Sequence, residues 1–230
     1  MNYLYLIVDL AALSVPFLFS FHPKIQLYKK WIALWPALLL TTLFFGVWDN
    51  YFTALGVWGF NPRYVTGYYL FNLPIEEILF FICIPYACLF TYFCFNIFLG
   101  NAFKIKYERQ ITLGIMIIIL ASGIIFYDRI YTLYTCLVLG ILLILLQFVL
   151  KVKWLSLFFY SHMFLLFPFF IVNGILTGTG PEEPVVWYNA SEIIGTRLMT
   201  IPIEDVFYGM AMLFFNTLLF EIFSKRSASV

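Results

Sequence analysis

The sequence predicts an all-α, polytopic membrane protein in which seven transmembrane helices form a 3+1+3 parallel repeat. Three observations support this fold class. Hydrophobic residues make up 63% of the 230 residues and charged residues only 11%, long charge-free stretches recur along the chain, and one acidic motif occurs twice. Soluble domains carry about 25% charged residues. The net charge of +1 offers no basic surface for nucleic acid, so we expect membrane lipid and no nucleic acid as a partner.

Seven stretches are close to the roughly 20 residues that a helix needs to cross a bilayer. The first, residues 3–21, contains Asp9; no Lys or Arg precedes it and no small-residue cleavage site follows, so we expect a retained helix. Five charge-free spans come next, at residues 31–48, 78–103, 110–127, 130–150 and 154–181. The seventh, residues 198–223, contains three acids. Strands of alternating polarity are absent from the sequence, which argues against a β-barrel.

The distribution of Lys and Arg predicts the orientation of the helices, because cytoplasmic loops are enriched in both. Ten of the thirteen follow the first, third, fifth and seventh spans, and three lie on the opposite side: Arg63, Arg129 and Arg197. We therefore expect a multi-pass protein of the cell membrane with its N-terminus outside and its C-terminus in the cytoplasm.

Motifs for cofactors and metals are missing. The four cysteines lie in apolar spans and form no Cys-x-x-Cys pair. The sequence has neither a Gly-x-Gly-x-x-Gly fingerprint nor a P-loop, no aspartate-rich motif for a magnesium-bound diphosphate, and no lysine within the seventh span for a retinal Schiff base. We expect no cofactor and no metal.

An internal repeat organises the chain. Its most distinctive element is a proline followed by isoleucine and two acids, which recurs after 128 residues together with an Asn and a Gly at the same spacing: Pro74-Ile75-Glu76-Glu77 with Pro202-Ile203-Glu204-Asp205, Asn61 with Asn189, and Gly67 with Gly195. Because both motifs enter the membrane from the same side, an odd number of helices, here one, must connect the repeats. The predicted units are residues 1–105, a connecting helix at 106–130, and residues 131–230.

The four acids of the motifs are the candidate catalytic residues: Glu76, Glu77, Glu204 and Asp205. A proline followed by acids is also a good helix start on structural grounds alone. However, the acids come in pairs, twice, and follow apolar, aromatic segments, which indicates a function. In a poorly hydrated site one carboxyl is held neutral while a neighbour is ionised. This suits chemistry that adds and removes protons, and equally proton-coupled transport.

Further candidates surround the motifs. Phe80 and Tyr208 each lie four residues after the first acid, on the same helical face, where an aromatic ring stabilises a cation or belongs to an interfacial aromatic belt. Asn61, Asn189 and Arg197 complete the candidate substrate-binding set.

Other polar residues have simpler expected roles. Asp49, Arg63 and Arg197 flank the two motifs. An Arg near the carboxyls would hold one of them ionised, but we expect these three residues to be solvated in loops. His162, in the middle of the sixth span, is expected to hydrogen-bond a neighbouring helix.

The two acidic motifs and the sequences that precede them resemble the lycopene cyclase domain family. This family comprises heterodimeric-type bacterial carotenoid cyclases and the cyclase half of fungal bifunctional phytoene synthase/lycopene cyclases. The resemblance spans about residues 1–225, with its clearest matches at residues 48–50, 61–81, 173–178 and 187–208. In some members of that family the two repeats are separate subunits, whereas here they are fused and joined by the fourth helix.

The resemblance implies a lycopene beta-cyclase, an intramolecular lyase that acts on lycopene or a related acyclic carotenoid without a dinucleotide-binding fold. Acid–base cyclisation would give β-ionone rings, with ε and γ rings differing only in which proton leaves. Other carotenoid-pathway enzymes or a second copy of the chain are candidate partners. The alternative is a small parallel-repeat transporter with proton-coupling carboxylates, although the helices lack a polar stripe suited to sugar.

Overall fold

The computed structural model describes residues 3–100 and 103–227 and confirms an all-α polytopic membrane protein. Its seven α-helices are α1 (Leu4–Phe19), α2 (Trp31–Ala54), α3 (Ile75–Leu99), α4 (Glu108–Ile125), α5 (Ile130–Ile144), α6 (Leu155–Leu176) and α7 (Ile203–Ser227). A 3-10 turn, η1 (Leu27–Lys30), leads into α2, and a π-helical segment, η2 (Leu145–Val149), extends α5. Six of these helical stretches are long and apolar enough to cross a bilayer. The 16 residues of α1 span only about 24 Å.

The helices that carry the acidic motifs begin directly after the prolines. Pro74 is extended, with φ −63° and ψ 152°, so that α3 starts at Ile75. A two-stranded hairpin precedes each helix: β2 (Tyr69–Leu70) with β3 (Leu73–Pro74), and β5 (Arg197–Leu198) with β6 (Ile201–Pro202). The predicted start of the seventh span at residue 198 is therefore wrong, because residues 198–202 belong to a hairpin.

The backbone repeats with the same spacing as the sequence. Gly67 and Gly195 have φ values of 87° and 89°, and Phe71 and Met199, at the hairpin turns, have φ values of 54° and 59°. The segments that precede α3 and α7, residues 61–74 and 189–202, thus fold alike; we call them the lead-in segments. The domain boundaries at residues 105 and 130 stay a prediction.

A short sheet joins the two halves. Strand β1 (Trp58–Phe60) pairs antiparallel with β4 (Val186–Tyr188), and Gly59 lies opposite Trp187, its own counterpart in the repeat. On either side, the Asn61 N–H donates to the Val185 carbonyl and the Asn189 N–H to the Val57 carbonyl, each at 2.8 Å. This pattern places an approximate two-fold axis at the Gly59–Trp187 pair.

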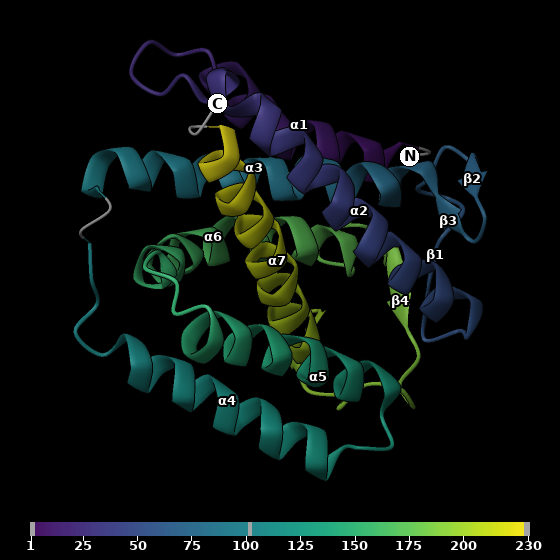
Figure 1. Cartoon of the computed structure of the whole chain (residues 1–230). Coiled ribbons are helices and arrows are strands. Elements are labelled where there is room, and N and C mark those ends of the chain that lie inside the picture. The colour runs from purple at the N-terminus through teal and green to yellow at the C-terminus, as the bar shows by residue number, and fades with distance from the viewer. Residues whose placement is uncertain (1–2, 101–102, 228–230) are drawn as a thin grey trace.

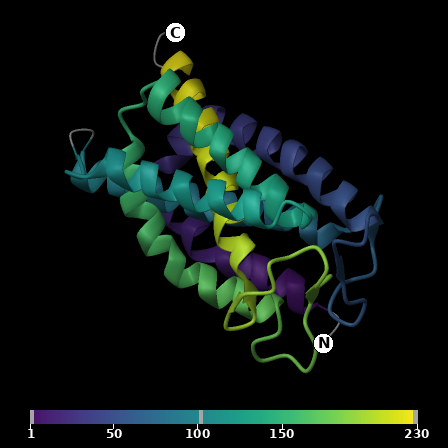
Figure 2. The ribbon, with the colours of Figure 1, turned by 90° about the horizontal axis from the view of Figure 1, so that it is seen from below.

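The helices of the two halves pack across this axis. Helix α2 packs on α7 and α3, α6 packs on α3, and α1 and α5 pack on α3 and α7 respectively, with α4 lying along the outside of α5 (Figure 1). Seen from below, the lead-in loops gather at the end of the bundle where the N-terminus lies, away from the C-terminus (Figure 2).

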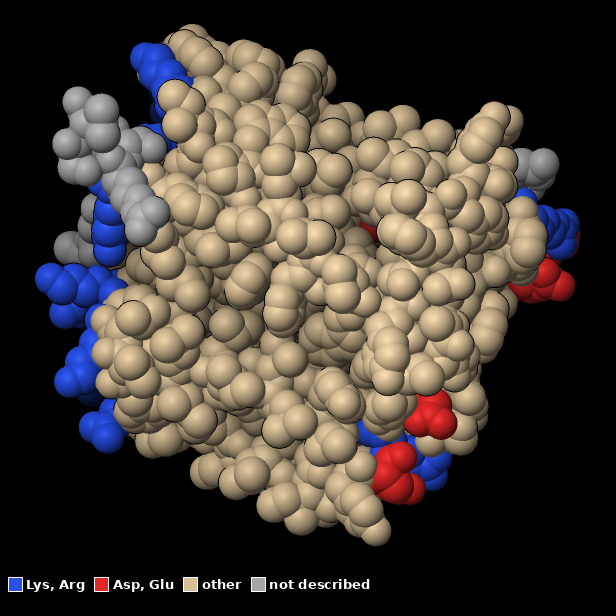
Figure 3. All heavy atoms as spheres, turned by 45° about the vertical axis from the view of Figure 1, so that its right-hand side comes forward, with Lys and Arg blue, Asp and Glu red and all other residues tan. Residues whose placement is uncertain are grey.

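The surface has the charge distribution of a membrane protein. Figure 3 shows a wide uncharged face with Lys and Arg gathered at one end and charges of both signs at the other. Large apolar side chains such as Ile32, Ile117 and Phe167 are at least 68% exposed on the helices. Acidic atoms are visible at the bottom of a hollow in this uncharged face (Figure 3).

Candidate active site

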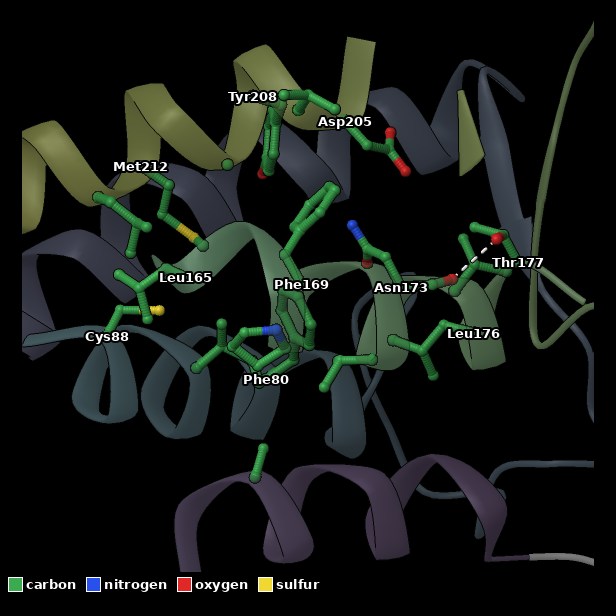
Figure 4. A pocket seen from close by; sticks show the side chains of 18 of the residues that line it. Phe80, Cys88, Leu165, Phe169, Asn173, Leu176, Thr177, Asp205, Tyr208 and Met212 are labelled. Atoms are coloured by element: carbon green, nitrogen blue, oxygen red, sulfur yellow. Dashed lines mark hydrogen bonds between the residues drawn. The ribbon is translucent and has the colours of Figure 1, made fainter. Parts of the chain in front are cut away.

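A cavity of about 350 Å³ lies between α3, α6 and α7, at their ends nearest the lead-in loops. Its volume is within the range of small-molecule sites. Figure 4 shows Asp205, Tyr208 and Met212 of α7 facing Leu165, Phe169, Asn173 and Leu176 of α6, with Phe80 and Cys88 contributed by α3. Most of the lining is apolar or aromatic, so the few carboxyls in it stand out.

The second acid of each motif lines the cavity, whereas the first does not. Glu77 and Asp205 belong to the lining and are 7% and 4% exposed. The Tyr5 hydroxyl donates to Glu77 Oε2 at 2.5 Å. The two carboxyls lie close enough to interact electrostatically. The structure thus brings together one acid from each half.

Asp205 is held by two phenols. The Tyr131 hydroxyl donates to Oδ1 at 2.7 Å and the Tyr188 hydroxyl to Oδ2 at 2.9 Å. Burial, reinforced by the negative charge of Asp205, raises the pKa of the Tyr188 hydroxyl well above its ordinary value near 10. Tyr188 is therefore a permanent donor at physiological pH.

The first acid of each motif binds the backbone of its own lead-in segment. Glu76 Oε1 accepts the Thr66 N–H, and Glu204 Oε1 accepts the Ile194 N–H, each at 2.6 Å. Thr132 of α5 also donates to Glu204 Oε1 at 2.7 Å. Both glutamates are almost fully buried. These bonds fix the loop that precedes each helix.

Phe80 and Tyr208 line the cavity, but with a different acid than expected. They share the cavity with Glu77 and Asp205, the second acid of each motif, which lie three residues before them. The first acid of each motif is not part of the lining. The Tyr208 ring lies 6.0 Å from that of Tyr131. Within the described residues, the buried Tyr208 hydroxyl has no hydrogen-bond partner.

Three predicted substrate-binding residues lie outside the cavity lining. Asn61 and Asn189 accept backbone N–H groups two residues further on, at 3.0 and 3.1 Å, which shapes both lead-in loops. Arg197 donates to the Thr200 carbonyl at 2.6 Å and lies over the Tyr188 ring, 5.8 Å from its centroid. Its charge therefore stands beside a tyrosine that donates to Asp205.

Two expectations about polar residues are wrong. Asp49 was expected in a solvated loop, but α2 continues to Ala54, so that Asp49 is buried and lines the cavity. His162 has no hydrogen-bond partner for either ring nitrogen among the described residues, although it was expected to bond a neighbouring helix. It stacks on Phe158 and lines the cavity.

Sequence reasoning missed the tyrosines that hold the carboxyls. Tyr5 and Tyr131 occupy the first turns of α1 and α5 and donate to the equivalent acids of the two halves. They are 126 residues apart, two fewer than the repeat spacing, so the comparison at a fixed offset does not pair them. Among residues 3–100 and 103–227, no group of three or more His, Cys, Asp or Glu is placed to hold a metal ion.

The fold and the cavity define a polytopic helical membrane protein whose interior holds carboxyl groups among apolar and aromatic side chains. The lycopene cyclase family model matches residues 2–95 and 128–223. The chain therefore belongs to the lycopene cyclase family, with two matched segments that leave out α4 between them. No curated protein and no solved structure matches the chain.

Proposed function

We propose that this protein is a lycopene cyclase that converts the ψ ends of lycopene to β-ionone rings, giving β-carotene by way of γ-carotene. The observation that carries this proposal is the pair of carboxyls, Glu77 and Asp205, that face one apolar, aromatic cavity from opposite halves of the chain. Membership of the lycopene cyclase family supports it and leaves the transporter interpretation without support.

The proposed reaction is an acid–base isomerisation. A carboxylic acid protonates the terminal double bond of the ψ end, and the resulting tertiary cation is attacked by an internal double bond, which closes the ring. A carboxylate then removes a proton from the ring cation. One proton enters and one leaves, so the product is an isomer of the substrate. General acid and base catalysis each contribute about 10²- to 10⁴-fold to such a rate.

The lining of the cavity suits a cationic intermediate. Phe80, Trp58, Phe169 and Tyr208 present aromatic rings, which attract cations without reacting with them as water does. Lycopene is a hydrocarbon that dissolves in the bilayer, and the hollow in the uncharged face shows acidic atoms at its bottom (Figure 3). We propose that the ψ end enters the cavity from the membrane through this hollow.

The remaining predicted site residues have supporting roles in this proposal. Glu76 and Glu204 position the lead-in segments through the backbone N–H groups that they accept. Asn61, Asn189 and Arg197 shape the same segments from outside the cavity. Phe80 and Tyr208 contact the substrate.

We also propose residence in the cell membrane with the N-terminus outside, because ten of thirteen Lys and Arg residues follow the odd-numbered spans. In this orientation the lead-in loops and the cavity lie toward the outer side. Association with other carotenoid-pathway enzymes or with a second copy stays a prediction.

Expression in bacteria engineered to accumulate lycopene tests the function directly. We expect chromatography of the extracted pigments to show γ- and β-carotene at the expense of lycopene, and cells that carry the empty vector to retain lycopene. Unchanged lycopene, with the protein folded in the membrane, would contradict lycopene as the substrate. The same result across a panel of acyclic carotenoids would contradict cyclase activity altogether.

A further inference from the structure

We propose that the two halves have diverged to form a single reaction site, in which Glu77 donates the proton and Asp205 removes it. This inference rests on the proposed cyclase function and assigns the roles within it. It follows from two departures from the approximate two-fold symmetry, one in the packing of the helices and one in the hydrogen bonds of the two carboxyls.

The first departure concerns the space beside each carboxyl. The cavity lies beside α6 and α7. The two-fold axis that relates the halves makes α2 the counterpart of α6 and α3 the counterpart of α7. The corresponding space in the first half lies between α2 and α3, where α2 packs directly on α3 as well as on α7. Its Phe45 and Trp48 rings lie 5.4 and 5.1 Å from the Tyr208 ring, and Phe45 is fully buried. Phe45 also packs with Phe81 of α3. Aromatic side chains therefore fill the symmetric space, and the second acids of both motifs serve one cavity.

The second departure concerns the donors to each carboxyl. Both oxygens of Asp205 accept a phenol hydroxyl, from Tyr131 and from Tyr188. Hydrogen bonds donated to a carboxylate favour its charged form, and each oxygen keeps a second lone pair for an incoming proton. Asp205 is therefore arranged as the base.

Glu77 has half of these donors. Tyr5 donates to Oε2 as Tyr131 does to Asp205, but the residue that corresponds to Tyr188 is Phe60, which has no hydroxyl. No described residue donates to Glu77 Oε1. This oxygen is free to carry a proton into the cavity. Asp49 also lines the cavity, and its buried Oδ2 has no donor among the described residues. Because carboxylates in one dry site repel one another, Asp205, which has the most donors, stays ionised, and Glu77 stays protonated.

The assignment gives a balanced cycle. The Glu77 O–H bond breaks as its proton forms a C–H bond at the terminal double bond, and the internal double bond closes the ring. A ring C–H bond then breaks, its electrons form the new double bond, and its proton passes to Asp205. Transfer of that proton from Asp205 to Glu77 resets the site.

The two roles predict different pigments from two carboxyl variants in lycopene-accumulating bacteria. Glu77→Gln removes the proton donor, so we expect unreacted lycopene and a loss of ring formation of about 10²-fold or more. Asp205→Asn leaves the donor in place, so the ring cation still forms and loses its proton to other acceptors. We expect ring isomers with a displaced double bond, or hydroxylated rings from capture by water, in place of β rings.

A conservative pair tests the same assignment without removing a carboxyl. Tyr188→Phe takes one donor from Asp205, so we expect a larger share of ring isomers. Phe60→Tyr is the matched variant at the symmetric position. A hydroxyl there stabilises ionised Glu77, so we expect slower total conversion with an unchanged ratio of ring types. Membrane levels and thermal unfolding in detergent identify any variant that fails to fold.

The assignment is overturned if Glu77→Gln yields ring isomers, or if folded Asp205→Asn and Tyr188→Phe yield only lycopene and β rings. These outcomes leave the proposed function intact as long as the unaltered protein converts lycopene. Failure of the unaltered protein to cyclise any acyclic carotenoid removes the function itself.

Discussion

At the scale of single residues, adjacent acids in one motif do different work. Glu76 and Glu77 are neighbours in the first turn of α3 and point to different surroundings. Glu76 binds the backbone of the lead-in segment, whereas Glu77 lines the cavity. The sequence identifies all four acids as candidates but does not separate the two kinds, because the direction of each side chain depends on where α3 and α7 begin and on what packs around them.

The role of Glu76 is tested by two substitutions, of which only one keeps an oxygen that accepts the Thr66 N–H. Glu76→Ala leaves the partly buried Thr66 N–H unpaired, which costs about 1 kcal/mol of stability, whereas Glu76→Gln keeps an oxygen that accepts this N–H. We expect Glu76→Ala to lower both the Tm in detergent and the conversion of lycopene, and Glu76→Gln to restore most of each.

A stable Glu76→Gln protein without any ring formation would show that the proton of Glu76 takes part in the reaction. It would also move Glu76 into the catalytic pair.

At the scale of elements, the β1–β4 pair is the joint between the halves. Gly59 lies opposite Trp187, and a Cβ atom added at Gly59 would come within 2.7 Å of Trp187 Cε2. Strand β4 also carries Tyr188, which lines the cavity. The pairing of the two halves therefore positions a hydrogen-bond donor of Asp205.

Gly59→Ala is expected to destabilise this joint. Overpacking of this kind costs about 1–3 kcal/mol, which lowers the Tm by several degrees in a chain of this size. Gly46→Ala, in α2, is the matched control, because an added Cβ there has no neighbour within 4 Å and alanine favours the helix. Thermal unfolding of both variants in detergent provides the comparison. Equal Tm values would contradict the tight packing of Gly59 on Trp187.

Much of this architecture is predictable from the sequence, and what is missed has a physical cause. Apolar spans and the doubled motif predict seven helices in two repeats, because membrane helices need long apolar stretches and the motifs keep a fixed offset. The hairpins before α3 and α7 are missed because most of their residues are apolar or aromatic and run directly into the helices that follow. The contributions of Tyr5 and Asp49 depend on the contacts between α1, α2 and α3, which no local pattern encodes.

At the scale of the whole molecule, the cavity that Glu77 and Asp205 share is expected to set the order of the products. Because α2 fills the space that is symmetric to the cavity, we expect the two ends of lycopene to react one after the other. The one-ring product must leave and return with its other end before the second ring closes.

We therefore expect free γ-carotene to precede β-carotene when the purified protein acts on lycopene in liposomes. Fresh lycopene added during the reaction competes with γ-carotene for the cavity, so it is expected to slow the formation of β-carotene. Pigments sampled over time by chromatography measure both effects. Formation of β-carotene from the start, without free γ-carotene and without competition, would indicate two working sites.

In the proposed reaction, an exchangeable carboxyl proton starts each ring closure. It is tested most directly by a single turnover in deuterated water, with the protein in liposomes and in excess over lycopene. We expect one deuterium for each ring formed, seen by mass spectrometry of γ- and β-carotene, and none in pigment recovered from the Glu77→Gln protein. Rings that close without taking up deuterium would contradict it.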